Sequence, residues 1–234
     1  MQFPLLYTLI KERFRSLNSL LKNRLVKNSI YTGLALIFIG LIPFTFNFLV
    51  GRTFGANTLG KINITLNFCL MITIFISNFF GSAGNKFLAE FRGRENFNNF
   101  IFTLKIIFFG SVVSLVFVSS VLLNWWSYFS EKFSLPQEAF NIIVIYIFSR
   151  TMYILFRRTL YGMDLVKNYT FNEIVSALVM LGTTFYVCFV GNENLLLQTY
   201  ILSYMIFFLF CVLSISKNFS SFKKKLNKNN ELSK

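Results

Sequence analysis

Six apolar runs, each about 20 residues long, recur along the chain and limit its fold more than any other feature of the sequence. A helix of that length crosses the hydrocarbon core of a bilayer, where only helices and closed barrels satisfy their backbone hydrogen bonds. The alternating pattern of a membrane barrel is absent from the sequence. The sequence therefore predicts an all-α integral membrane protein. Its bundle of six transmembrane helices is expected at Ser29 to Val50, Thr58 to Phe80, Phe100 to Leu123, Ala139 to Phe156, Phe171 to Val190 and Leu195 to Ser216.

Two polar segments flank the six runs. Residues 1–28 place leucines and isoleucines near helical spacing with basic residues between them, which is typical of an amphipathic helix lying on the membrane surface. Residues 217–234 are rich in lysine. We therefore predict an amphipathic interfacial segment at 1–28, a six-helix lobe at 29–216 and a basic cytoplasmic tail at 217–234.

The 23 lysines and arginines give a net charge of +14 and are spread unevenly between the two predicted sides. The side that holds both termini collects most of them, whereas the other side has Arg52, Lys61 and Lys132. Because basic loops stay in the cytoplasm, we expect both termini to be cytoplasmic in a multi-pass protein of the cytoplasmic membrane. These charges suit anionic membrane lipids, and their spread over four membrane-adjacent segments argues against nucleic acid as a partner.

The sequence gives little support for an enzyme. It contains no histidine, and Cys69, Cys188 and Cys211 fall inside predicted spans at spacings unlike any metal motif. The predicted loops contain no paired carboxylates, no phosphate-binding glycine loop and no nucleophile elbow. We predict a protein that is not an enzyme and uses no metal or cofactor.

Polar residues inside the fourth run form a stripe. At 100° per residue, a sector about 80° wide contains Tyr146, Arg150, Tyr153, Arg157 and Tyr161. An arginine stays charged when desolvated and can donate two parallel hydrogen bonds, so the stripe is suited to a phosphate or pyrophosphate. Alternatively, Arg150 pairs with Glu173 of the fifth run or extends to the membrane surface.

A weaker polar face occurs in the second run, where Asn63, Asn67 and Asn78 project within about 60° of one another. These side chains are expected either to hydrogen-bond to neighbouring helices or to line a cavity.

The turn between the first two runs, GRTFGANTLGKINITL, interrupts the apolar pattern. Its glycines Gly51, Gly55 and Gly60 are expected to permit a tight reversal of the chain. Arg52 is isolated from other basic residues, which favours a local role: capping carbonyls at the end of the first helix or guarding a cavity mouth.

Two motifs support a family resemblance. The first hairpin carries Gly51, Arg52, Phe54, Gly55, Leu59, Gly60 and Ile62, with Gly84, Lys86 and Phe87 near its end. The second motif is LFRRTLYGMDLVKNYTFNEIVSALV. Over roughly Ser29 to Val190 the chain resembles the polysaccharide transporter branch of the multidrug/oligosaccharidyl-lipid/polysaccharide exporter superfamily. The resemblance implies the N-terminal six-helix lobe of that fold.

The resemblance implies a flippase that translocates a polyprenyl-pyrophosphate-linked oligosaccharide across the membrane by alternating access. In such a flippase Arg150 and Arg157 would contact phosphate and Arg52 would guard the outer mouth. The side chains that would contact the sugars of the oligosaccharide or water are Tyr146, Tyr153, Asn63 and Asn67.

The chain is half as long as the resemblance requires. Members of that superfamily have twelve or more helices in two lobes, and alternating access needs both. We therefore expect a truncated or split product, or a half-transporter that pairs with itself or with a second six-helix chain. A multidrug-type antiporter is the first alternative, disfavoured because acidic residues are scarce in the spans; a non-transporting membrane scaffold is the second.

Overall fold

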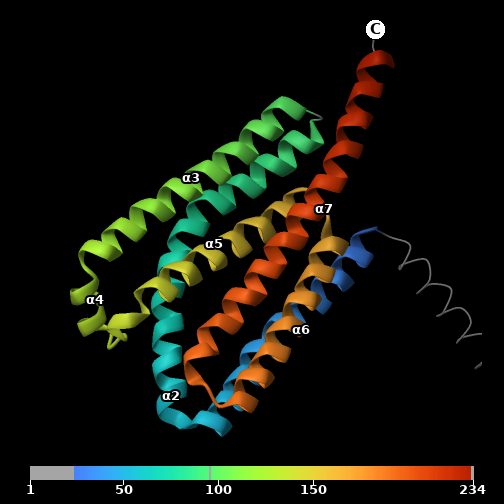
Figure 1. Ribbon diagram of the computed structural model, residues 1–234. Helices are drawn as coiled ribbons and strands as arrows, with labels where there is room; N and C mark the ends of the chain where they lie inside the picture. Colours follow the sequence, from blue (N-terminus) through green and yellow to red (C-terminus); the bar gives the residue numbers. More distant parts are fainter. Residues whose placement is uncertain (1–23, 95, 233–234) are drawn as a thin grey trace, which may run out of the picture.

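The computed structural model describes residues 24–94 and 96–232, and these residues form helices with no strand (Figure 1). The long helices are α2 (Arg24–Gly93), α3 (Phe97–Asn124), α5 (Phe140–Gly162), α6 (Val166–Val190) and α7 (Leu196–Leu232). The short ones are α4 (Trp126–Lys132), η1 (Gln137–Ala139) and η2 (Glu193–Leu195). The predicted all-α fold is confirmed. Most of the predicted amphipathic segment at 1–28 lies outside the described residues.

Helix α2 consists of two arms joined at Gly55. Gly55 is the one residue of α2 with non-helical backbone angles, φ 85° and ψ 172°, in a region that is essentially restricted to glycine. The chain reverses there, so residues 24–54 and residues 56–93 form a helical hairpin (Figure 1). Gly51 and Gly60 are helical. The predicted turn is therefore made by a single glycine.

The two arms of α2 cover the first two predicted spans, and α3, α5, α6 and α7 cover the other four. Among the described residues, five helices are long and apolar enough to cross a membrane, with α2 counted once. Helix α7 continues past the predicted end of the sixth span as far as Leu232. The protein is a multi-pass membrane protein.

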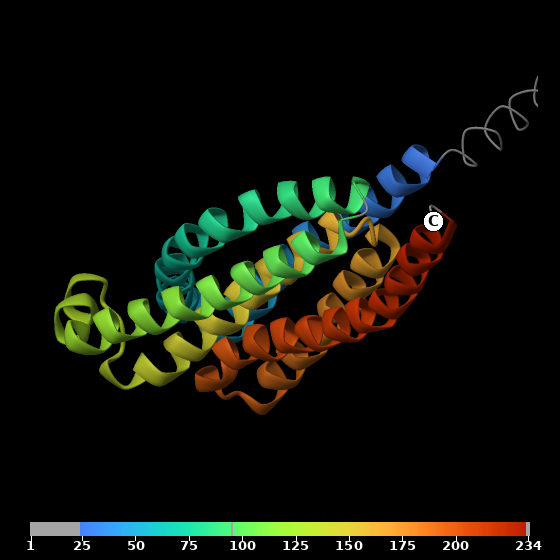
Figure 2. The same ribbon diagram turned by 90° about the horizontal axis from the view of Figure 1, so that it is seen from above.

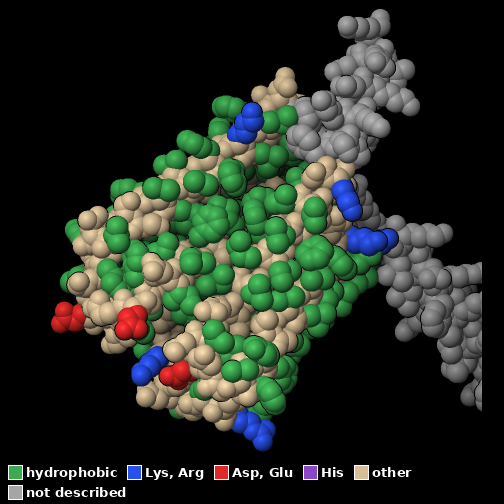
Figure 3. All heavy atoms as spheres, in the orientation of Figure 1, with side chains coloured by type: hydrophobic (Ala, Val, Ile, Leu, Met, Phe, Trp, Pro, Cys, Tyr) green, Lys and Arg blue, Asp and Glu red, His purple; other side chains and the backbone are tan. Residues whose placement is uncertain are grey.

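The outer surface of the bundle is apolar. Phe44, Phe75 and Phe189 are 71%, 79% and 92% exposed, which suits contact with lipid rather than with water. On the face shown in Figure 3, the charged side chains gather toward the two ends and leave a largely hydrophobic middle. This distribution matches a bundle that spans a bilayer.

The two ends of the bundle collect different turns. The start of α2, the α2–α3 turn, the α5–α6 turn and the end of α7 lie together at one end, here called the termini end (Figures 1 and 2). Two contacts link these segments there: the Asn28 side chain donates to Asp164 at 3.2 Å, and Arg92 pairs with Asp164 at 3.8 Å. At the opposite end, called the Gly55 end, the Thr58 hydroxyl donates to Glu193 at 2.7 Å.

Helices α5 and α6 both pack against α2 and α7, and α3 packs on α2. The two arms of α2 therefore bring the rest of the bundle together. Close approach of α3 depends on Gly84, since a Cβ atom there would lie 2.3 Å from the Ile107 side chain. The interior of the bundle is not wholly apolar, since it includes the fully buried Tyr146 and Tyr169 together with Asn172 and Glu173, which are 1% and 2% exposed.

We expect Gly55→Ala to destabilise the chain by about 1–3 kcal/mol, because a Cβ atom is strained at this positive φ. The measurement is thermal unfolding of the purified full chain in mild detergent, followed by circular dichroism. Gly60→Ala is the matched control, because Gly60 is helical and a Cβ atom at that position would have no neighbouring atom within 4 Å. That variant should be neutral or slightly stabilised. Equal unfolding midpoints for the two variants would contradict a turn made by Gly55.

Candidate functional site: a polar column inside the bundle

One face of α5 carries polar side chains toward α6 and α7. Residues 146, 150, 153 and 157 recur at helical spacing, so their side chains lie above one another along the helix. With Glu173 of α6 and the tyrosines of α7 they form what we call the polar column. Its members are Tyr146, Arg150, Tyr153, Arg157, Glu173, Tyr200 and Tyr204.

Arg150 is held by two tyrosines. Its Nη1 atom donates to the Tyr146 hydroxyl at 2.5 Å and to the Tyr204 hydroxyl at 3.1 Å. The guanidinium lies 5.8 Å and 5.7 Å from the centres of the same two rings, within the range of cation–π attraction. Its buried Nε has no hydrogen-bond partner in the described part of the chain. Within that part no carboxylate pairs with Arg150, so its charge is met by neutral groups alone.

Glu173 pairs with Arg157, so the predicted alternative of a pair with Arg150 is wrong. The carboxylate is 2% exposed and its Oε1 lies 3.7 Å from Arg157 Nε. The Tyr153 hydroxyl donates to it at 2.9 Å from one oxygen and 3.1 Å from the other. The Arg157 side chain remains 27% exposed and its guanidinium lies 5.5 Å from the centre of the Tyr169 ring. Glu173 is therefore enclosed, whereas Arg157 can still be reached.

Arg158 faces away from the column, toward the second arm of α2. It donates to the Ser77 carbonyl, the Ser82 hydroxyl and the Asn78 side-chain oxygen at 2.9, 2.9 and 2.7 Å. Gly81 permits this approach, because a Cβ atom there would lie 2.7 Å from the Arg158 side chain. Arg158 ties α5 to α2, and Asn78 serves as its acceptor.

Tyrosines of α7 complete the column on the side opposite α5. The Tyr153 and Tyr204 rings stack at 4.7 Å, and the Tyr200 ring lies 6.1 Å from Tyr146 and 4.8 Å from Phe46 of α2. Sequence reasoning missed Tyr200 and Tyr204. The available signal was their four-residue separation within an apolar run, which places both on one helix face.

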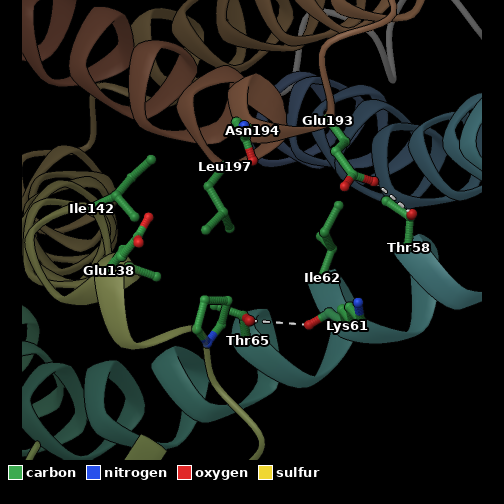
Figure 4. Close-up of a pocket in the computed structure, with 11 residues that line it drawn as sticks. Thr58, Lys61, Ile62, Thr65, Glu138, Ile142, Glu193, Asn194 and Leu197 are labelled. Atoms are coloured by element: carbon green, nitrogen blue, oxygen red, sulfur yellow. Dashed lines mark hydrogen bonds between the residues drawn. The ribbon is translucent and has the colours of Figure 1, made fainter.

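A pocket of about 400 Å³ opens at the Gly55 end of the same helices (Figure 4). The second arm of α2 lines one side with Thr58, Lys61, Ile62 and Thr65. The remaining wall is made by Pro136, Glu138, Ala139, Ile142, Glu193, Asn194 and Leu197. On α5, Ile142 is one helical turn from Tyr146, so the pocket lies at the end of the polar column. Its charges are of both signs, one ammonium and two carboxylates.

The other predicted site residues are not brought together with the column. Arg52 is exposed just before Gly55 and does not line the pocket. Asn63 is half-buried and Asn67 is exposed, and no hydrogen bond among the described residues joins either to Arg150 or Arg157. In the same part of the chain no cluster of cysteine and carboxylate side chains could hold a metal ion.

No protein-family model, curated protein sequence or solved structure matches the chain.

We expect Tyr153→Phe to lower the free energy of unfolding by about 1–3 kcal/mol, because it keeps the ring and removes a donor from the buried Glu173 carboxylate. The matched control is Tyr186→Phe, since the Tyr186 side chain is 63% exposed on α6. Chemical denaturation in mixed micelles would compare the two variants with the unmodified chain. If both variants unfold alike, Tyr153 does not stabilise Glu173.

Proposed function

We propose that the chain transports lipid-linked oligosaccharide precursors across the cytoplasmic membrane, acting as one lobe of a flippase. The polar column would hold the anionic headgroup, a polyprenyl pyrophosphate, while the lipid tail stays in the bilayer. The observation that carries the proposal is Arg150, a guanidinium inside the bundle with a buried donor that no described residue accepts. A site of this kind is suited to an anion.

The electrostatic reason is the cost of a charge away from water. A lone buried cation is unfavourable, and it is tolerated when it pairs or when it serves a ligand. Two tyrosine hydroxyls and two rings lessen that cost at Arg150 without cancelling the charge. Arg157, two helical turns away on the same face, could supply a second guanidinium to the same headgroup. Two guanidiniums on one face of α5 would supply two positive charges to the anionic pyrophosphate.

The orientation of the bundle in the membrane is inferred from the charges at its two ends. The termini end carries the basic residues of four described segments, namely Arg24, Lys27, Lys86, Arg92, Arg94, Lys167 and Lys217 with the arginines at the end of α5. The Gly55 end has Arg52, Lys61 and Lys132. By the positive-inside rule the termini end would face the cytoplasm and the end pocket would open to the outside. The headgroup would then move along α5 from Arg157 toward the pocket.

A second lobe is part of the proposal. Alternating access rocks two repeats against each other around a fixed site, which six helices alone do not provide. The second lobe would come from a second copy of this chain, from a separate six-helix chain or from a longer product of which these residues are one part. The resemblance of the GRTFGANTLGKINITL and LFRRTLYGMDLVKNYTFNEIVSALV motifs to polysaccharide transporters supports this assembly.

We expect Arg150→Gln to weaken the binding of farnesyl pyrophosphate, a short-chain analogue of the proposed substrate, by about tenfold or more. The reason is that a charge-assisted hydrogen bond is worth about 1.5–3 kcal/mol and about 1.4 kcal/mol is tenfold in affinity. Isothermal titration of the purified chain in detergent measures the affinity.

Arg94→Gln is the matched control, since the Arg94 side chain is 72% exposed at the termini end. Unchanged affinity in Arg150→Gln, or an equal loss in Arg94→Gln, would count against a headgroup site in the column. In cells, Arg150→Ala should stop glycan export while the protein still inserts into the membrane, and export at the normal level would reject the transport role.

A further inference from the structure

The Glu173–Arg157 pair lies at the part of the proposed headgroup site that is nearer the termini end. The two partners are held very differently. Glu173 is 2% exposed and receives the Tyr153 hydroxyl at both oxygens, at 2.9 and 3.1 Å. Arg157 contacts it through Nε at 3.7 Å, longer than a close charge-assisted hydrogen bond, and stays 27% exposed. The carboxylate is fixed, whereas the guanidinium is loosely attached and open to a second anion.

We infer that an anionic headgroup binds to Arg157 in exchange for Glu173, and that Glu173 takes up a proton as the exchange occurs. This inference rests on the proposed function and adds proton coupling to it. Glu173 is then the resident anion of the empty site, and the headgroup is its replacement.

The physical reason is the charge that the exchange would leave behind. Once an anion takes the Arg157 guanidinium, an ionised Glu173 would remain enclosed with a neutral hydroxyl as its donor and a new negative charge nearby. Both effects favour the protonated carboxylic acid. The proton, supplied by water at the open side of Arg157, bonds to one carboxylate oxygen.

Tyr153 can hydrogen-bond to Glu173 in its protonated, neutral state as well. Because its hydroxyl lies within hydrogen-bond distance of both Glu173 oxygens, whichever oxygen stays unprotonated can still accept from it. Protonation therefore leaves no orphaned acceptor at this position. The same tyrosine serves the ionised and the protonated forms.

The groups that face Glu173 come from three helices. They are Tyr153 and Arg157 of α5, Tyr169 on α6 itself, and Tyr204 and Cys211 of α7. Of these, Arg157 is the cation, and its departure to a ligand is the event that changes the charge around Glu173.

Linkage fixes the sign of the pH dependence. If binding takes up one proton, affinity rises as pH falls, by up to about tenfold per pH unit while free Glu173 is ionised. Glu173→Gln removes the competing anion and the titration together. It should bind more tightly than the unmodified chain at high pH, and the two affinities should converge at low pH.

The experiment titrates farnesyl pyrophosphate into the purified full chain in detergent across a range of pH. The probe's own protonation is common to both proteins, so the ratio of the two dissociation constants isolates Glu173. We expect this ratio to change by up to about tenfold per pH unit. A pH-independent ratio overturns the inference.

A double variant, Arg157→Gln with Glu173→Gln, guards against misfolding of the single variant, since it leaves neither charge of the ion pair without its partner. It also removes the Arg157 guanidinium, so its affinity at every pH is expected to be lower. Its pH profile should match that of Glu173→Gln, and a profile like that of the unmodified chain would also overturn the inference.

Failure of the proposed function has a different signature: the probe then binds Arg150→Gln and the unmodified chain equally at every pH. If binding depends on Arg150 but the ratio of the two dissociation constants does not change with pH, the headgroup site is supported and only the proton coupling is rejected.

Discussion

The charge of Arg150 has to be accommodated inside an apolar helical bundle, and the packing around α5 depends on how this is done. The guanidinium contacts Tyr146 on its own helix and Tyr204 on α7, so it joins the two helices that meet there. Tyrosine is suited to this role, because one side chain offers a hydroxyl acceptor, a ring face for the cation and an apolar edge for the core. The buried tyrosines of the column therefore serve packing and electrostatics together.

Three arginines within nine residues of α5 are stabilised by three different kinds of partner. Arg150 contacts neutral aromatic hydroxyls, Arg157 contacts a carboxylate and a ring, and Arg158 contacts a backbone carbonyl with polar side chains. The hydrogen bonds of Arg158 all go to the second arm of α2, which fixes α5 to that arm. Arg157 makes the longer contact, 3.7 Å to Glu173, and its side chain is 27% exposed. Arg158 therefore attaches α5 to α2, whereas its neighbour Arg157 has a loosely held partner and can contact a ligand.

The sequence predicted the helices and the α5 face well, because both depend on local periodicity. A run of about 20 apolar residues implies a span whatever surrounds it, and a spacing of three or four residues implies one helix face. Partners across helices depend on how far one helix is shifted along another. For that reason the sequence allows a pair between Glu173 and Arg150 where the structure has Glu173 with Arg157, and it does not indicate the contact between Arg150 and Tyr204. The turn in α2 shows the same limit of sequence reasoning. Three glycines predict a turn, but the sequence does not tell which of them adopts the non-helical conformation, and in the structure it is Gly55.

The direction of adjacent side chains explains why the column and the α2 contacts stay separate. Arg157 and Arg158 are consecutive, so their side chains leave the helix about 100° apart. One reaches Glu173 on α6 and the other reaches Asn78 on the second arm of α2. A ligand that draws Arg157 away from α6 would therefore leave the α5–α2 attachment at Arg158 intact. The proposed headgroup site could change its ion pairing while the helix that carries it remains anchored.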